Sequence, residues 1–277
     1  MIQTWAPEDL WAVAQPLIPV AAKRPQGGGK RRADDRAVLA AIGYMVQAGC
    51  SWRKLPAALF GVSRPTVHRR FSEWTRYGLW EQIHHALLHR LNVAGGIDWS
   101  RAMIDSISVR ALKGDLTGPN PVDRGKPGSK IHVLCDRRGV PLQVLISAAN
   151  TPDAQLLFPL LDALTPVRGR RGRPRRRPGK LHADKAYDHK AIRAEVRRRG
   201  IAVRIARKGI ESSQRLGRHR WIVESCLSWF TNNRRLARRY ERKAEHFQAF
   251  ADLAAILICH RRLAGSSRHQ ASLADRE

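Results

Sequence analysis

The chain of 277 residues combines a substantial apolar content with a very large positive charge. Hydrophobic residues make up 43% of it, too much for a disordered chain, and the length is enough for one or two domains with a proper core. Lys and Arg number 51 against 23 Asp and Glu, a formal net charge of +28, so we expect a polyanionic partner, nucleic acid first. A solvated basic surface without a partner is the alternative.

The cysteines and the apolar stretches exclude further classes of protein. The four cysteines form no C-x-x-C pair, which argues against a zinc ribbon or a disulfide framework and agrees with a reducing cytosol. The longest apolar stretch, near residues 250–259, is too short and too interrupted to span a bilayer, so no membrane partner is expected.

Residues 1–97 are predicted to form a helical DNA-binding domain. One helix begins at Asp34 or Asp35 and ends at Gly49, because apolar residues recur every three or four positions between them. A short apolar run, a glycine turn and a second helix from Ser63 follow, an order typical of a helix-turn-helix. The alternative is a solvated amphipathic helix. The outward-facing candidates for DNA contact are Arg64, Arg69 and Arg70.

The pattern changes near residue 98 to strand-like segments separated by glycine- and proline-rich loops. The expected order β-β-β-α-β-α-β-α-α predicts an α/β domain over residues 98–264, with a mixed sheet flanked by helices. Residues 265–277 are a polar tail, expected to be disordered. The expected strands are 101–112, 130–136, 141–147, 179–184 and 201–206, and the expected helices are 153–164, 188–199, 218–236 and 244–262.

Three acidic residues stand out because each lies on a predicted element of a very basic chain. Asp105 lies inside an apolar strand, where an unpaired carboxylate is costly, Asp184 ends the strand LHAD, and Glu224 lies in the helix RHRWIVESCLSWF. Three carboxylates from three elements can converge on Mg²⁺ or Mn²⁺. Two such ions about 3.5–4 Å apart can activate a water or hydroxyl at a phosphodiester. The alternative is that Asp105 and Asp184 only pair with arginines.

Two arginine-rich segments are expected to contact the DNA backbone. Seven of the ten residues 168–177 are Arg, and the interrupting Gly and Pro favour a loop that becomes ordered on binding. A second basic run lies near the end of the helix 218–236 and just beyond it. Arginines that meet phosphates release counterions, so affinity should fall steeply with salt. The candidates are Arg170, Arg171, Arg173, Arg175, Arg176, Arg234 and Arg235.

A series of motifs extends over nearly the whole chain. They are AGCSWRKLP and FGVSRPTVHRRFSEWTRYGLWEQI in the helical part, and MIDSISVRA, GPNPVDRGKPGSKIHVLCDRRGVPL, ANTPDAQLL, KLHADKAYDHKAIRAEVRRRGI and LGRHRWIVESCLSWFTNNRRLARRYER in the remainder. In this order they resemble a DDE transposase of a bacterial insertion sequence, of the insertion sequence 5 type within the larger 4 and 5 grouping.

The resemblance implies a ribonuclease-H-like fold in which Asp105 lies on the first strand, Asp184 just after the fourth, and Glu224 on a later helix. It implies that these three residues are catalytic and hold Mg²⁺, for which Mn²⁺ can substitute, as two ions. It further implies binding of terminal inverted repeats in double-stranded DNA, cleavage, and transfer of the 3′-hydroxyl to target DNA. A homodimer or larger DNA-bound assembly in the bacterial cytoplasm, at the nucleoid, is expected. The rivals are a non-catalytic DNA-binding regulator derived from a transposase and a ribonuclease-H-like nuclease.

Three basic residues near the acids are further candidates for contact with DNA. The resemblance places Lys130 near the site, as a phosphate contact or a solvated lysine. Arg220, four residues before Glu224, either holds the scissile phosphate or pairs with that Glu, and Lys185 is a weaker DNA-contact candidate. The family often has Tyr and Lys where this chain has Gly217 and Thr231, which puts the shape of the DNA groove in doubt. Two further interpretations concern residues outside the site: core or helix packing for Trp221 and Trp229, and plain helix surface for His84, His85 and His89.

Overall fold

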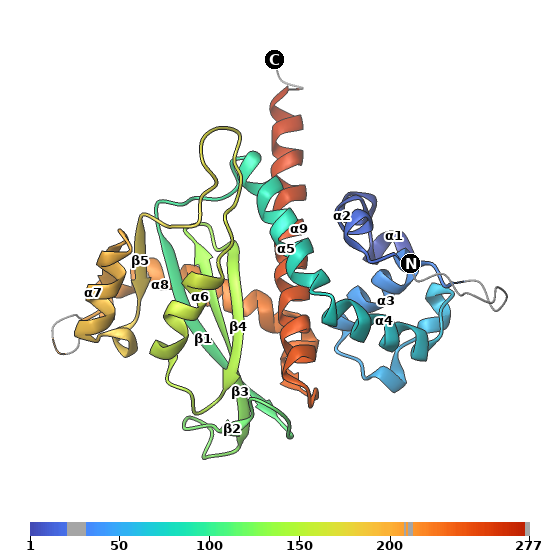
Figure 1. Cartoon of the computed structure of the whole chain (residues 1–277), viewed down its shortest axis with the longest axis horizontal. Helices are drawn as coiled ribbons and strands as arrows, with labels where there is room; N and C mark the ends of the chain where they lie inside the picture. Colours follow the sequence, from blue (N-terminus) through green and yellow to red (C-terminus); the bar gives the residue numbers. More distant parts are fainter. Residues whose placement is uncertain (21–31, 208, 210–212, 275–277) are drawn as a thin grey trace.

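The computed structural model describes residues 1–20, 32–207, 209 and 213–274, with the side chains of 213–220 and 266–274 left out. A helical part and a sheet part lie on either side of two long helices, α5 and α9 (Figure 1). The helices that precede the sheet in the chain are α1 (Ile2–Trp5), α2 (Glu8–Ala14), α3 (Asp35–Ala48), α4 (Arg64–Arg76) and α5 (Leu79–Val93), with 3₁₀ turns at Gln15–Leu17, Trp52–Lys54 and Ala57–Phe60.

The helix boundaries follow from the capping residues. Asp34 caps α3 by accepting a hydrogen bond from the backbone N of Arg36, and Gly49 ends the helix with φ 69°. Ser63 caps α4 by accepting from the backbone N of Thr66. The predicted starts of both helices are confirmed. The predicted first helix of the helix-turn-helix is instead a 3₁₀ turn of four residues.

The seven-stranded sheet combines antiparallel and parallel strand pairs. Strand order is β2-β3-β1-β5-β6, with β4 on β3 and β7 on β1. β1 pairs antiparallel with β3 and parallel with β5. The predicted mixed sheet flanked by helices is confirmed. Its strands are β1 (Ala102–Ala111), β2 (Gly118–Pro119), β3 (Pro127–Asp136), β4 (Pro141–Ala148), β5 (Lys180–Ala183), β6 (Ala202–Ile205) and β7 (Arg238–Arg239).

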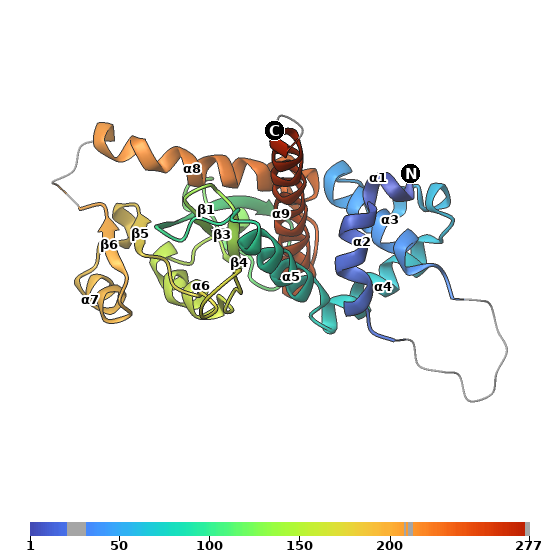
Figure 2. The same ribbon diagram turned by 90° about the horizontal axis from the view of Figure 1, so that it is seen from above.

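Helices cover both faces of the sheet. Figure 2 shows α8 along one face and α6 against the other. α8 packs on β1 and β3, whereas α6 packs on β3 and β4. The remaining elements are α6 (Leu157–Ala163), α7 (Lys190–Arg198), α8 (Ser213–Asn232) and α9 (Ala244–Ala274), with 3₁₀ turns at Asp153–Leu156, Lys185–Tyr187 and Arg234–Leu236.

The helix α9 joins the two parts of the molecule. It packs against α5 and β4, and the buried apolar residues of both parts form one continuous core. Its Gln248 accepts a hydrogen bond from Ile146 N and donates one to Val144 O, on the outer edge of β4. α9 continues to Ala274, so most of the predicted disordered tail is helical. Within the described residues, no helix is long and apolar enough to cross a membrane.

Candidate active site and nucleic-acid interface

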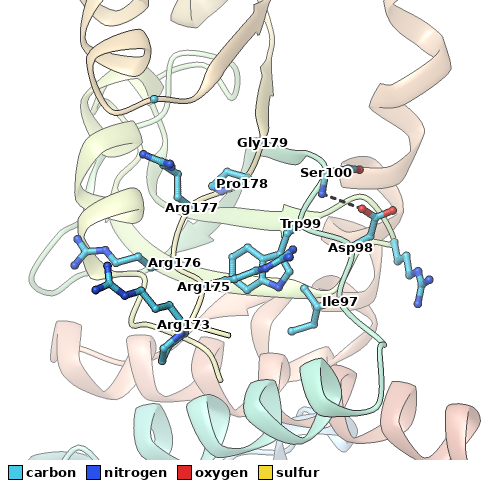
Figure 3. A pocket seen from close by; sticks show the side chains of 13 residues that line it. Ile97, Asp98, Trp99, Ser100, Arg173, Arg175, Arg176, Arg177, Pro178 and Gly179 are labelled. Carbon is cyan, nitrogen blue, oxygen red and sulfur yellow. Dashed lines mark hydrogen bonds between the residues drawn. The ribbon is translucent and has the colours of Figure 1, made fainter. Parts of the chain in front are cut away.

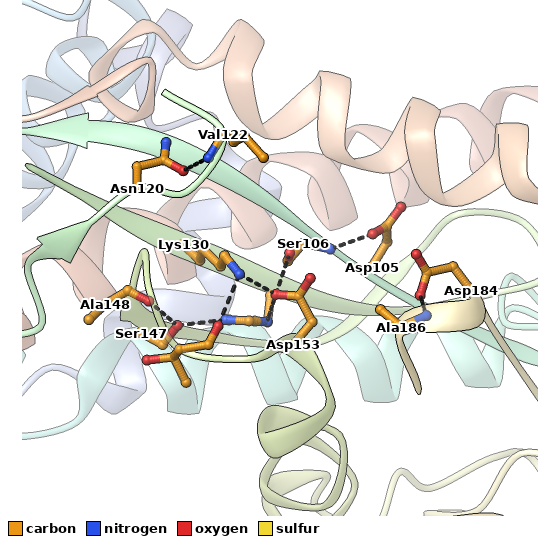
Figure 4. Close-up of polar contacts among 12 residues, drawn as sticks. Asp105, Ser106, Asn120, Val122, Lys130, Ser147, Ala148, Asp153, Asp184 and Ala186 are labelled. Carbon is orange, nitrogen blue, oxygen red and sulfur yellow. Dashed lines mark hydrogen bonds and ion pairs between the residues drawn. The ribbon is translucent and has the colours of Figure 1, made fainter. Parts of the chain in front are cut away.

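The sheet register brings two of the predicted carboxylates to the same level. Met103 on β1 is paired with His182 on the parallel strand β5. Asp105 and Asp184 each lie two residues further on, and side chains two residues apart point to the same face of a sheet. The two carboxylates therefore project from neighbouring chain segments on one face, as Figure 4 shows.

Both carboxylates are oriented by backbone donors and are half-buried. Ser106 N donates a 2.8 Å hydrogen bond to Asp105 Oδ1, and Ala186 N donates one of 2.8 Å to Asp184 Oδ1. The second bond begins the 3₁₀ turn Lys185–Tyr187, which Asp184 caps.

Glu224 comes from the helix that covers this face. It is exposed on α8, which packs on β1. The buried thiol of Cys226, two residues later, lies against Cys135, the partner of Met103 in β3, which fixes this part of α8 over the Asp105 side of the sheet. The three acids do not form a ready-made cluster: the described residues contain no group of three or more His, Cys, Asp or Glu placed to hold one metal ion.

Tyr187 is a buried residue of this region that the sequence reasoning missed. Its side chain is 1% exposed, and its hydroxyl has no hydrogen-bond partner among the described residues. Burial raises the pKa of Tyr187, and so do the nearby charges of Asp153, Asp105 and Asp184. The signal in the sequence was its position, three residues after Asp184 in the motif ADKAYD.

A polar network occupies the opposite face of the sheet. Lys130 Nζ donates to Asp153 Oδ1 at 2.8 Å and to Thr151 O at 2.9 Å, and Ser106 Oγ donates to Asp153 at 2.9 Å. Lys130 is paired with Ser108 on β1. Ser108 lies three residues beyond Asp105, and because side chains alternate along a strand, Ser108 and Lys130 point to the opposite face of the sheet. Lys130 is therefore not a solvated lysine, and Asp153 holds it on the face of the sheet opposite Asp105.

His132 completes this network as a neutral imidazole. Burial lowers its pKa to about 4. Its Nε2 lies 2.8 Å from Ser147 Oγ, while Nδ1 lies 3.9 Å from Asp153 Oδ1. Asp153 is therefore the centre of a network that touches Ser106, the residue next to Asp105.

Two of the three arginines that were predicted to contact DNA from the helical part are exposed. Arg64 and Arg69 are exposed on α4, and Arg64 Nε donates to Leu55 O. The prediction that Arg70 faces outward is wrong. Its side chain is buried, with the residue 6% exposed, and lies between Asp35, at 3.6 Å, and Glu73, at 3.0 Å. A buried guanidinium needs such carboxylate partners, so Arg70 faces inward.

The arginine loop 168–177 is exposed and folded back on α5. Val167 and Arg175 exchange two backbone hydrogen bonds of 2.7 and 2.8 Å. Arg168 N donates to His89 Nδ1 at 2.7 Å, and His85 Nε2 donates to Pro166 O at 3.1 Å. These contacts differ from the expectation of a loop ordered only on binding. His85 and His89 of α5 thus hold the loop in place. His84 is buried, and burial lowers its pKa to about 4.

The second basic run is divided between surface and interior. Arg234 in this run is exposed, and so is Lys185, which lies after β5 and outside the run. The prediction that Arg235 contacts DNA is wrong in this structure. Arg235 is 3% exposed, pairs with Glu241, and donates to Cys50 O at 2.9 Å. It links the end of α8 to the end of α3, so it is not available to DNA. The side chain of Arg220 lies outside the described residues.

Two tryptophans of α8 have different environments. Trp221 is 60% exposed, which corrects the prediction that it packs in the core or against a helix. It lies three residues before Glu224, on the same exposed face of α8. Trp229 does pack: the guanidinium of Arg262 on α9 lies 4.4 Å from its ring centre.

Comparisons with known proteins agree with this geometry. Residues 7–84 match the family model "Putative transposase of IS4/5 family", and residues 100–259 match "Transposase DDE domain". The chain is 45% identical over 143 residues to the "Putative transposase for insertion sequence element IS402" of Burkholderia cepacia, covering 52% of this chain and 68% of the relative. An uncharacterised 16.2 kDa protein of the same element is 36% identical over 116 residues, 41% of this chain and 79% of the relative.

Two solved structures have only a weak likeness to the chain. A pre-cleavage Mos1 transpososome and a Mos1 mariner paired end complex with Mn are similar to 88% of this chain and 82% of theirs. Their TM-scores are 0.27 and 0.25, at 12% and 11% identity. A likeness this weak supports nothing about the chain.

The assignment rests on the family models together with the paired carboxylates on β1 and after β5. A transposase DDE domain over residues 100–259 implies use of divalent metal ions and binding of DNA. The chain belongs to the DDE transposase family, in its IS4/5 group, and is a DNA transposase.

Proposed function

We propose that Asp105, Asp184 and Glu224 are the catalytic carboxylates of this transposase. The observation that carries the proposal is the position of Asp105 and Asp184 at the same level of neighbouring chain segments, on the face that α8 covers with Glu224. Before any metal binds, three carboxylates repel one another, so a separate Glu224 on an exposed helix face is compatible with this role.

The residues present fit a hard divalent cation. Carboxylate oxygens are the donors that Mg²⁺ and Mn²⁺ prefer, and no thiol or imidazole is needed. We propose Mg²⁺, with Mn²⁺ as a substitute, and two ions. When bound, the ions would activate the attacking oxygen and stabilise the leaving oxygen of a phosphodiester. The backbone N–H groups of Ser106 and Ala186 orient the two Asp carboxylates for that role.

The substrate is proposed to be the terminal inverted repeats of the insertion sequence that encodes the chain. Residues 1–97 would bind the repeat with the exposed Arg64 and Arg69 of α4, and residues 98–264 would cleave it. Water first attacks the phosphodiester at the end of the element and frees a 3′-hydroxyl. That hydroxyl then attacks a phosphodiester of target DNA, which breaks one bond and forms another.

The DNA backbone would be held by the exposed basic residues. The candidates that face solvent are Lys185, Arg170, Arg171, Arg173, Arg175, Arg176 and Arg234. The two ends of an element must be brought together, so we propose a homodimer or a larger assembly on DNA, acting at the bacterial nucleoid. Arg220 remains proposed as a phosphate contact or as a partner of Glu224.

The decisive experiment is cleavage and joining of a labelled inverted-repeat end in Mg²⁺ or Mn²⁺. Wild-type protein is compared with Asp105→Asn and Glu224→Gln, and with Asp115→Asn as a control at an exposed acid away from β5. The expected result is joined product from the wild type and the control only, with DNA binding retained by all four. Cleavage by the Asp105 or Glu224 variants at the wild-type rate would disprove the assignment.

The same experiment separates the rival functions. Binding without cleavage by the wild type would favour a non-catalytic regulator. Cleavage without a joined product, under conditions that give efficient cutting, would favour a ribonuclease-H-like nuclease.

A further inference from the structure

A second basic site lies at the end of the sheet opposite the catalytic carboxylates. A pocket of about 800 Å³ is lined by five arginines and one acid, Asp98. In Figure 3 the arginines of the loop lie on one side of this pocket, and residues 97–100 lie on the other. The arginines are Arg138, Arg173, Arg175, Arg176 and Arg177.

The pocket is built from anchored backbone. Gly179 N donates to Trp99 O at 2.8 Å, and Arg175 is held by its two bonds to Val167. Trp99 is 5% exposed, and its Nε1 donates to Asn92 on α5 at 2.9 Å. Gly200, with φ 71°, makes room for Arg177, because a Cβ there would lie 2.7 Å from Arg177 Nη1. The arginine backbone is therefore positioned before any ligand arrives.

Among the described residues, carboxylates leave most of the positive charge of the pocket uncompensated. Arg173, Arg175 and Arg176 are exposed, and none of them forms an ion pair with a carboxylate in the part of the chain that the structure describes. Asp98 is already engaged, since it accepts from Ser100 N at 2.9 Å and lies 3.5 Å from Arg137. Unpaired guanidinium groups on fixed backbone are suited to bidentate contacts with phosphate oxygens.

The pocket is separate from the carboxylate pair. Trp99, Ser100 and Gly179 precede β1 and β5, whereas Asp105 and Asp184 lie three or four residues beyond the first residues of those strands. At a rise of about 3.3 Å per residue, the two sites are at least about 10–13 Å apart along the strands. One phosphate cannot occupy both sites, but one DNA backbone can pass from one to the other.

We propose that this arginine pocket binds the phosphodiester backbone of duplex DNA several nucleotides away from the phosphate that is cut. The inference rests on the proposed action on DNA, and it adds a built second contact to that function. The DNA is either the end of the element or the target, which share this chemistry. Because the loop is anchored on α5, DNA in the pocket would also contact the part of the molecule that leads to the helical domain.

The test compares two double variants with the same loss of charge. Arg175→Ala/Arg176→Ala removes two pocket residues, and Arg197→Ala/Arg204→Ala removes two exposed arginines, on α7 and β6, that neither line the pocket nor belong to the candidates for DNA contact. Binding to an element-end duplex is measured without metal by fluorescence anisotropy as a function of salt. Joining into an unlabelled unrelated plasmid is measured in parallel. Binding needs no catalysis, so its outcome is independent of the carboxylate assignment.

If the pocket holds the element end, the pocket variant loses about tenfold or more in affinity, and its salt slope falls by about 1.8, because each lost phosphate contact changes it by about 0.9. The control variant changes much less. If the pocket holds target DNA, end binding is kept and capture of the plasmid falls in the pocket variant only. Equal losses in both variants, in both assays, would overturn the proposal.

A measurement on the unmodified protein guards against a folding defect. Single phosphates of the element end and of a target duplex are replaced one at a time by neutral methylphosphonates. The proposal expects a loss of binding or joining at one or two positions several nucleotides from the cut or joined phosphate. Uniform small effects along both duplexes would overturn it.

Discussion

Lys130 Nζ and Asp153 Oδ1 form a 2.8 Å ion pair on the face of the sheet opposite Asp105, with side chains 14% and 24% exposed. Ser106 joins the two faces, because its side chain donates to Asp153 and its backbone N donates to Asp105. The pair therefore stabilises the strand segment that carries Asp105.

Asp153→Asn is expected to lower the free energy of unfolding. The change leaves the ammonium of Lys130 mostly buried without a countercharge, which costs about 1–3 kcal/mol. Urea unfolding measures the loss. The matched control is Asp123→Asn, whose partner Arg110 is 57% exposed, and there the unfolding midpoint should hardly move. A midpoint shift as small for Asp153 as for Asp123 would contradict the stabilising role.

Trp221→Ala is expected to weaken binding of a DNA end while leaving the fold intact. The ring is 60% exposed beside Glu224, and stacking on an unpaired base is worth about 1–3 kcal/mol, a loss of about tenfold or more in affinity. Trp229→Ala is the matched control, since it removes the ring that packs on Arg262 and should lower the melting temperature instead. Unchanged affinity of the Trp221 variant for an end with unpaired terminal bases would exclude stacking.

Asp252→Asn is expected to stabilise the protein above neutral pH. Burial raises the pKa of Asp252 from 3.8 to about 7, so between these values the folded chain holds a proton that the unfolded chain releases. Wild-type stability therefore falls as pH rises through this range. The amide removes this dependence and can still accept from Gln248 Nε2, which lies 2.8 Å from Asp252.

Chemical unfolding at several pH values tests this prediction. The gain over wild type should grow from pH 4 to pH 7, reach at least about 1 kcal/mol, and then level off. Asp115→Asn, at an exposed position, serves as the control and should show no such trend. A constant difference across the range would show that Asp252 does not titrate with a raised pKa.

His84→Gln is expected to make the protein more resistant to mild acid. Burial lowers the pKa of His84 from 6.5 to about 4, so the unfolded chain binds a proton that the folded chain does not. This contribution to stability is complete above pH 6.5 and is lost as pH falls toward 4. The Gln amide can still donate to Pro141 O, now 2.9 Å from His84 Nε2, without titrating. Melting temperatures from pH 7 to pH 4 should fall less steeply for the variant, and parallel curves would contradict the assignment.

Local sequence determined the helix starts, and long-range pairing determined what could not be predicted. Asp34 and Ser63 cap their helices with backbone groups two or three residues away, so the pattern was visible in the chain. Arg235, in contrast, is buried by a contact with Cys50, which lies 185 residues earlier. Its neighbours in the sequence are basic and give no sign of that contact.

The candidate site shows the same division. Asp105 and Asp184 were recognisable because apolar strands carry them, but only the parallel register of β1 and β5 places them at one level. The position of Lys130 on the opposite face depends on Asp153, which follows 23 residues later in a separate turn and gives no local signal in the sequence. Trp221 looked like a packing residue because its helix is otherwise apolar on one side.

The contact between Gln248 and β4 limits how two copies of this transposase can associate. An outer strand with free N–H and C=O groups can pair with a strand of another molecule. On β4 the N–H of Ile146 and the carbonyl of Val144 are already bonded to the side chain of Gln248. The sheet is therefore closed to extension at these positions, and a second copy that approaches this side must contact helices or loops instead.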